Sequence, residues 1–98
     1  MQAYMITLLL PRELTLEFVA TIPVHRAHIN RLFEQGRLTS YSVAADRSRV
    51  WATMVGASEE EVRAEVEKMP LYRFAEVSIQ PLLFQNLAAT RLPVISLN

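Results

Sequence analysis

The amino-acid sequence predicts an α+β protein in which two helices cover a single four-stranded antiparallel sheet. Three observations support this prediction: apolar runs of strand length, two stretches with helical periodicity, and Pro or Gly residues where these segments end. The segments follow the order strand, helix, strand, strand, helix, strand, which is the ferredoxin-like arrangement. A chain of 98 residues has room for one hydrophobic core, so we expect one domain over residues 1–83 and a C-terminal tail over residues 84–98.

Four segments are predicted to be strands. Residues 3–10 are apolar at odd and even positions, so both faces of this strand should be covered. Residues 38–45 and 50–56 form two further strands, because the polar residues 46–48 between them suit a hairpin turn. The last strand covers residues 75–83, and the proline within it favours the edge of the sheet.

The first helical stretch lies between the first two strands. Thr15 is placed to cap a helix that begins at Leu16. Because Pro23 lacks an amide N–H and crowds the preceding turn, we expect a short helix before it and a second helix that starts near it. Gly36 supplies the left-handed residue that ends this second piece.

The helical stretch after the hairpin carries its own start signal. Ser58 followed by Glu61 forms a capping box. Val62, Val66 and Met69 then form a narrow apolar stripe among charged residues, so one side of this helix should pack and the rest should be solvated.

The apolar content of the chain predicts assembly. Hydrophobic residues make up 51% of the sequence and charged residues only 20%, which is apolar for so small a domain. Two helices cover one face of the sheet, so we expect the other face to pack on a second copy in a homodimer or higher homo-oligomer. The tail over residues 84–98 is also apolar, and we expect it to pack on a neighbouring subunit.

Composition narrows the classes of partner. Ten basic and ten acidic residues balance, so the charge favours neither nucleic acid nor a membrane surface as a partner. Cysteine is absent, which excludes disulfides, thiolate metal sites and cysteine nucleophiles and fits a cytoplasmic protein. The apolar start of the chain has no basic residues and ends at Pro11, too short for a signal peptide or a membrane span.

His25 is the strongest candidate for a functional residue. It lies in the middle of an apolar helical arc formed by Ile22, Ile29, Leu32 and Phe33. Its ordinary pKa of about 6.5 suits a group that takes up and returns a proton near neutrality. The alternative is a structural histidine that bonds a strand carbonyl or a tail residue.

His28 lies about 60° from the centre of this arc, where we expect solvent or an interface. His25 and His28 have no evident third partner of the kind a metal site needs, so we predict no metal ion.

Aromatic residues are candidates for the wall of a ligand cavity. Tyr41, Trp51, Tyr72 and Phe74 occur in or near predicted strands, where the alternative role is core or interface packing. Nine of the ten basic residues are arginine, which favours contacts to carboxylates. An arginine near the hairpin, Arg47 or Arg49, or Arg73 after the second helix would hold a carboxylate if it faced His25.

Four short segments carry a family resemblance. Residues 32–38 (LFEQGRL), 58–61 (SEEE), 69–72 (MPLY) and 79–82 (IQPL) resemble muconolactone delta-isomerase and its small relatives. The resemblance implies a dimeric α/β barrel, often assembled into rings of dimers, with no metal or organic cofactor. The namesake moves a double bond within a lactone ring by abstracting a proton at one carbon and returning it to another.

The sequence departs from this family at the positions that matter most. Counted back from Gly36, the positions of the namesake's proposed glutamate and lysine carry His25 and Arg26. Histidine is able to shuttle a proton and arginine to hold a carboxylate, so the same chemistry is conceivable with these altered residues, and we predict His25 as the catalytic residue and Arg26 as a substrate-binding residue. The chain is also similar to YCII-related domains, which place a helix histidine at His25 and a proline-containing turn near Pro70.

Three functions remain open from the sequence. The first is a cofactor-free isomerase that shifts a proton in a small carboxylated or lactone substrate, with His25 as the proton carrier and Arg26, Tyr41, Trp51 and Tyr72 as the ligand contacts. The second is a non-catalytic ligand-binding or assembly module with a structural His25. The third is a cofactor-free monooxygenase of aromatic compounds. An enclosed cavity beside His25 would favour chemistry, and tight packing there would favour the module.

Overall fold

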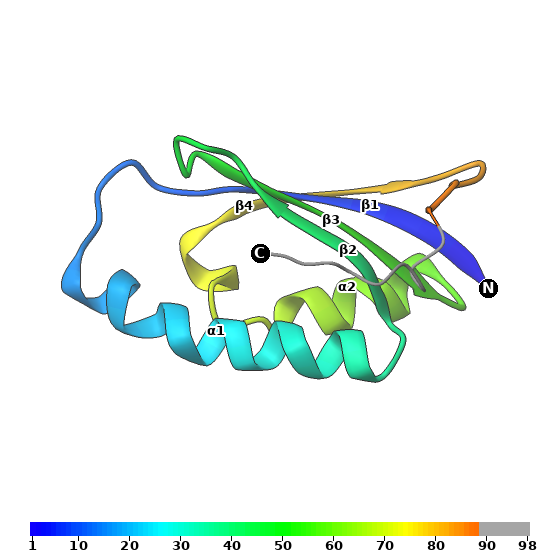
Figure 1. Ribbon diagram of the computed structural model, residues 1–98, viewed down its shortest axis with the longest axis horizontal. Coiled ribbons are helices and arrows are strands. Elements are labelled where there is room, and N and C mark those ends of the chain that lie inside the picture. The colour runs from blue at the N-terminus through cyan, green and yellow to red at the C-terminus, as the bar shows by residue number, and fades with distance from the viewer. Residues whose placement is uncertain (89–98) are drawn as a thin grey trace.

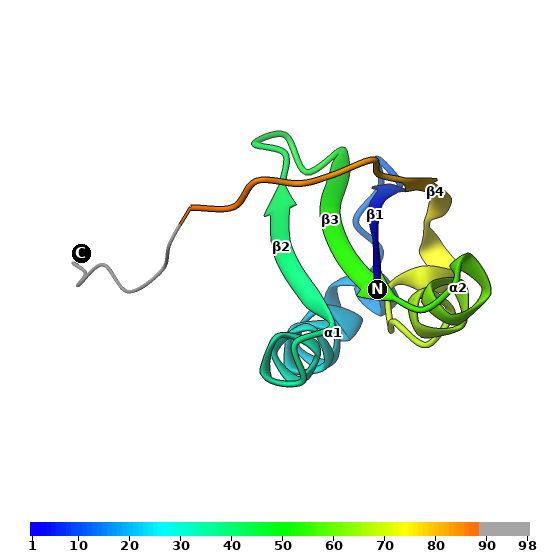
Figure 2. The ribbon, with the colours of Figure 1, turned by 90° about the vertical axis from the view of Figure 1, so that its right-hand side faces the viewer.

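In the computed structural model, which describes residues 1–88, both helices lie on the same side of one antiparallel sheet (Figures 1 and 2). The elements in chain order are β1 (Gln2–Leu9), α1 (Leu16–Glu34), β2 (Leu38–Val43), β3 (Arg49–Gly56), α2 (Glu59–Glu67), a 3₁₀ turn (Tyr72–Phe74) and β4 (Glu76–Pro81). The sheet order is β2-β3-β1-β4, and every neighbouring pair is antiparallel. The predicted α+β, ferredoxin-like arrangement is therefore confirmed, and β4 with its proline forms a sheet edge.

The core fills the space between the sheet and the helices. Alternate residues of β1 point toward the helices, and the apolar stripe of α2 belongs to the same buried cluster. The core consists of Tyr4, Ile6, Leu8, Ile29, Leu32, Leu38, Val50, Ala52, Met54, Val62, Val66 and Met69. Burial of these side chains is the main source of stability in a domain of this size.

Helix α1 is continuous, so the expectation of two helices broken at Pro23 was wrong. The helix runs from Leu16 to Glu34 with Pro23 inside it. An interior proline costs roughly 3 kcal/mol. Phe18 before the proline and His25 after it are both buried by the same helix face. Packing on both sides of the proline therefore holds the two halves in one helix.

The predicted helix ends are confirmed in atomic detail. The Thr15 hydroxyl accepts a hydrogen bond from the Phe18 amide at 3.1 Å. Gly36 adopts a φ of 72°, and the amides of Gly36 and Arg37 donate to the carbonyls of Phe33 and Leu32, both at 3.0 Å. This pair of bonds is the Schellman motif, which needs a left-handed residue at that point.

The N-terminus of α2 is also capped as expected. The Ser58 hydroxyl accepts from the Glu61 amide at 3.2 Å, and the Glu61 carboxylate accepts from the Ala57 amide at 2.6 Å. The reciprocal bond thus reaches one residue before the capping serine.

The face of the sheet away from the helices is mixed in polarity, where the sequence suggested an apolar face. Trp51 is 40% exposed there. The Thr53 hydroxyl lies 2.6 Å from that of Thr39 and 2.7 Å from that of Ser40. Packing of this face on a second copy stays a prediction.

The role of the tail also stays a prediction, because residues 89–98 lie outside the described residues. Among residues 1–88, the helices include none with the length and apolar character needed to span a membrane.

Candidate functional site

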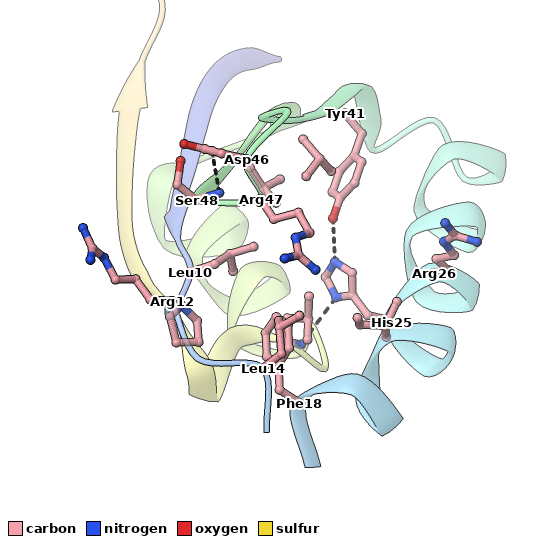
Figure 3. A pocket seen from close by; sticks show the side chains of 15 residues that line it. Leu10, Arg12, Leu14, Phe18, His25, Arg26, Tyr41, Asp46, Arg47 and Ser48 are labelled. Atoms are coloured by element: carbon pink, nitrogen blue, oxygen red, sulfur yellow. Dashed lines mark hydrogen bonds between the residues drawn. The ribbon is translucent and has the colours of Figure 1, made fainter. Parts of the chain in front are cut away.

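A cavity of about 510 Å³ lies beside His25, between the first half of α1 and the β2–β3 hairpin (Figure 3). Much of its wall is apolar, with contributions from Leu10, Phe18, Ile22 and Val50. His25, Tyr41 and Arg47 bring polar groups into this setting. A mostly apolar cavity with a few polar groups is typical of a small-molecule site.

Tyr41 reaches the cavity because of an irregularity in β2. Leu38 pairs with Met54 and Tyr41 pairs with Ala52, and the register shifts between Leu38 and Ser40. Residues three apart in a regular strand point to opposite faces. The bulge adds one residue and places both Leu38 and Tyr41 on the helix side of the sheet.

His25 is hydrogen-bonded at both ring nitrogens and is only 3% exposed. Its Nε2 lies 2.8 Å from the Tyr41 hydroxyl oxygen, and the Leu71 amide donates to Nδ1 at 3.4 Å. Because an amide N–H only donates, Nδ1 must accept, and a neutral ring then carries its proton on Nε2. In this tautomer Nε2–H donates to the Tyr41 oxygen, and the Tyr41 O–H is left free to donate into the cavity.

Burial sets the charge state of this pair. Removal from water, with a smaller contribution from the nearby His28, lowers the pKa of His25 from 6.5 to about 4. Burial also raises the pKa of Tyr41 to about 12, while Arg26 acts in the opposite direction. Both side chains are therefore neutral at pH 7.

Arg47 brings a cation into the cavity. Its guanidinium points from the hairpin toward His25 and Tyr41, whereas Arg12 and Arg26 point away from the centre of the cavity (Figure 3). Arg47 forms no salt bridge with a carboxylate among residues 1–88. An unpaired cation over an apolar wall favours an anionic ligand.

The hairpin turn fixes the direction of Arg47. Arg47 has a φ of 64°, a left-handed conformation that a non-glycine residue adopts at some cost. Its amide donates to the Ala44 carbonyl at 2.8 Å, and the Asp46 carboxylate accepts from the Ser48 amide at 2.9 Å. Hydrogen bonding to the Ser48 side chain and, second, to the Ser48 amide holds the pKa of Asp46 below its usual range.

The cavity brings together three of the five site residues predicted from the sequence. His25, Arg26 and Tyr41 line it, although Arg26 points outward. Trp51 and Tyr72 are not among its lining residues. Trp51 alternates with buried Val50 and Ala52 and so faces the other side of the sheet. Tyr72 packs half-buried against the core from the 3₁₀ turn.

Two groups of the site were not assigned from the sequence. Arg47 was one of three arginines named as possible carboxylate contacts, and the sequence did not show which of them faces His25. The polar turn around Arg47 was the feature that could have indicated it. The Leu71 amide carries no signal in the sequence, because any residue at that position has an N–H. In residues 1–88, no three His, Asp or Glu side chains are close enough to form a metal-ligand group.

Comparison with known proteins identifies the family. A search of curated proteins found no match to the chain. The family model of muconolactone delta-isomerase matches residues 4–85, which is most of the sequence. The match includes both helices and all four strands, apart from the first two residues of β1. The chain belongs to the muconolactone delta-isomerase family.

Proposed function

We propose that this protein is a cofactor-free isomerase that shifts a proton within a small carboxylated or lactone ligand bound in the cavity beside His25. The observation that carries the proposal is the buried His25–Tyr41 hydrogen bond of 2.8 Å at the wall of an otherwise mostly apolar cavity. Membership in an isomerase family supports the reaction class. The volume of about 510 Å³ is in the range of small-molecule sites.

Arg47 supplies the contact for the ligand's negative charge. Its guanidinium points into the cavity and has no carboxylate partner in the described chain. A guanidinium binds a carboxylate through two parallel hydrogen bonds, and the apolar wall strengthens that attraction by excluding water. The same cation stabilises the enolate that forms when a carbon beside a carbonyl loses its proton.

Proton transfer requires the second tautomer of His25. With the proton on Nδ1, Nε2 accepts from the Tyr41 hydroxyl. The change replaces the 3.4 Å bond from Leu71 with two N–H groups that face each other, at a cost of about 1–3 kcal/mol. The Tyr41 oxygen then takes the ligand's C–H proton while its own proton passes to Nε2. This step leaves an enolate and an imidazolium. Reversal of the relay at a second carbon completes the isomerisation and restores both side chains.

The test of this proposal measures the exchange of the ligand's C–H protons with solvent deuterium. Muconolactone is incubated with the protein in D₂O, and deuterium at the ligand's ring carbons is followed by NMR together with turnover. We expect Tyr41→Phe to lower kcat by about 10²-fold or more, because it breaks the relay. Arg47→Gln should raise KM about tenfold, and Arg49→Gln is its control because that arginine does not line the cavity. Absence of both deuterium uptake and turnover would contradict the isomerase proposal.

A second function is ligand binding without turnover, and one observation favours it. Both nitrogens of His25 are occupied in the tautomer that the Leu71 contact favours, and the Tyr41 O–H then donates to the ligand without a proton transfer. The ¹⁵N chemical shifts of the His25 ring in the ligand complex distinguish the two functions. A proton on Nδ1 is expected for the isomerase, and a proton on Nε2 with no deuterium uptake is expected for the binding protein.

A further inference from the structure

A second hollow lies between α1 and α2, apart from the cavity beside His25. Its volume is about 520 Å³, and it shares no lining residue with the first cavity. His28 and Arg31 come from α1, Arg37 follows that helix, and Glu65 and Lys68 come from the end of α2. Polar and charged side chains thus make up nearly the whole lining.

Positive charge is in excess around this hollow. Arg31, Arg37 and Lys68 contribute three cations, and Glu65 is the single carboxylate of the lining. Glu65 pairs with Arg37 at 2.9 Å and lies 3.7 Å from Lys68, and Arg37 also lies 3.9 Å from Glu61, which is outside the lining. Arg31 has no carboxylate within salt-bridge distance in the described part of the chain. One carboxylate therefore serves two of the cations and leaves the third without a partner.

His28 adds a second, independent observation. Its Nε2 is buried and has no hydrogen-bond partner among residues 1–88. A buried polar atom without a partner is destabilising, and native proteins contain few of them. The charged groups that act on this ring are Arg31, Lys68 and Glu65. The His28 ring lines the hollow, so a small shift of the side chains over Nε2 would let an acceptor bound there reach it.

We propose that this hollow binds the phosphate group of a small molecule, held by Arg31, Lys68 and His28. A phosphate dianion offers several acceptor oxygens and two charges, which matches donors that approach from two helices. A monocarboxylate offers only two oxygens and one charge and would leave part of this donor set unused. Arg37 stays with Glu65 and shapes the edge of the site.

The experiment measures the binding of inorganic phosphate by calorimetry, in phosphate-free buffer with chloride keeping the ionic strength constant. Arg31→Gln and Lys68→Gln should each weaken binding about tenfold. Arg63→Gln is the matched control, because Arg63 lies on α2 and pairs with Glu59 at 3.2 Å, outside the hollow. Circular dichroism checks that each variant is folded. Equal weakening in all three variants would show general charge attraction and would overturn the proposal.

A further variant should change the phosphate affinity in the opposite direction. Glu65→Gln removes the one carboxylate of the lining and frees Lys68, while Arg37 keeps the carboxylate of Glu61 at 3.9 Å, so the change should tighten phosphate binding severalfold. NMR gives the second readout: bound phosphate should raise the pKa of His28, because a nearby anion favours the charged ring. Absence of phosphate binding in the wild-type protein, or an unchanged His28 ring during saturation, would overturn the proposal. Tyr41→Phe should leave phosphate affinity unchanged, which separates this site from the isomerase cavity.

Discussion

Helix α1 carries two histidines three residues apart, and they lie in opposite chemical settings. His25 is buried beside an apolar cavity, and both of its nitrogens have partners, Tyr41 and Leu71. His28 is half-buried beside a charged hollow, and its Nε2 has no partner in residues 1–88. A step of three residues turns the helix by about 60° in projection, which is enough to move a side chain from one hollow to the other.

The comparison shows that burial alone does not define a site. Burial lowers the pKa of both rings, so both favour the neutral form. The difference lies in the neighbours. A phenol and an amide form hydrogen bonds that fix the orientation of His25, whereas an arginine, a lysine and a glutamate act on His28 through their charges. The first setting suits proton transfer or recognition of a neutral oxygen, and the second suits an anion.

The largest expected effect is on stability in acid. The pKa of His25 is about 4 in the folded protein, below its ordinary value of 6.5. Between pH 6.5 and pH 4 the His25 ring binds a proton in the unfolded chain but not yet in the folded protein. The contribution of His25 to the free energy of unfolding is therefore complete above about pH 6.5 and is lost as the pH falls toward 4. The loss approaches about 3 kcal/mol. Urea unfolding at pH 7 and pH 4 measures it.

Leucine variants of the two histidines show which ring causes this pH dependence of stability. His25→Leu should remove most of the pH dependence over that interval, since leucine does not titrate. His28→Leu should keep most of it. Carboxylates also titrate in this range, so the informative quantity is the difference between each variant and the wild type. A slope that is the same in His25→Leu and the wild type would contradict the assignment of the pKa of His25.

The next effect is the cost of removing the His25 ring at pH 7. His25→Leu leaves the Leu71 amide and the Tyr41 hydroxyl without their partner, so we expect a loss of about 2 kcal/mol in the free energy of unfolding. The double variant with Tyr41→Phe should lose about 1 kcal/mol less than the sum of the single variants, because both ends of the shared bond are then apolar. Additive losses would show that the two side chains are not coupled.

The fold was accessible from the sequence, because its signals are local. Thr15, Gly36 and Ser58 each mark a helix end through backbone chemistry that depends on a few neighbouring residues. The placement of His25 on the buried face followed from helical periodicity alone. Pro23 was misjudged, because its local cost is overcome by packing that the helix makes with the rest of the protein.

The site was less accessible, because its geometry depends on contacts between distant segments. Tyr41 faces His25 only because of the bulge near Ser40, and a regular strand would have turned it to the other face of the sheet. Arg47 points into the cavity because of its left-handed backbone. That conformation is usually predicted from a glycine, and this position carries an arginine instead. Trp51 was misleading because β3 is apolar at successive positions, so the pattern did not say which face meets the helices.

A smaller effect concerns the strained residue at the mouth of the His25 cavity. Arg47→Gly removes the cost of a left-handed non-glycine residue, and we expect the free energy of unfolding to rise by about 0.5–1 kcal/mol while muconolactone binds more weakly. Arg49→Gly, in the regular strand β3, should be destabilising by a similar amount. Chemical unfolding and ligand titration of the same samples measure both quantities. A loss of stability in Arg47→Gly would show that the arginine side chain stabilises the hairpin.

The smallest effect is expected at the second histidine, and its sign carries the information. His28→Leu removes a buried nitrogen that has no partner within residues 1–88 and replaces it with an apolar group of similar size. In phosphate-free buffer we therefore expect the free energy of unfolding to stay the same or to rise by up to about 1 kcal/mol, opposite in sign to His25→Leu. Added phosphate should stabilise the wild type and should stabilise this variant less, because ligand binding to the folded state raises its stability with the logarithm of the ligand concentration over Kd. A loss of stability without phosphate would mean that the His28 ring has a structural partner, and the contrast between the two histidines would then disappear.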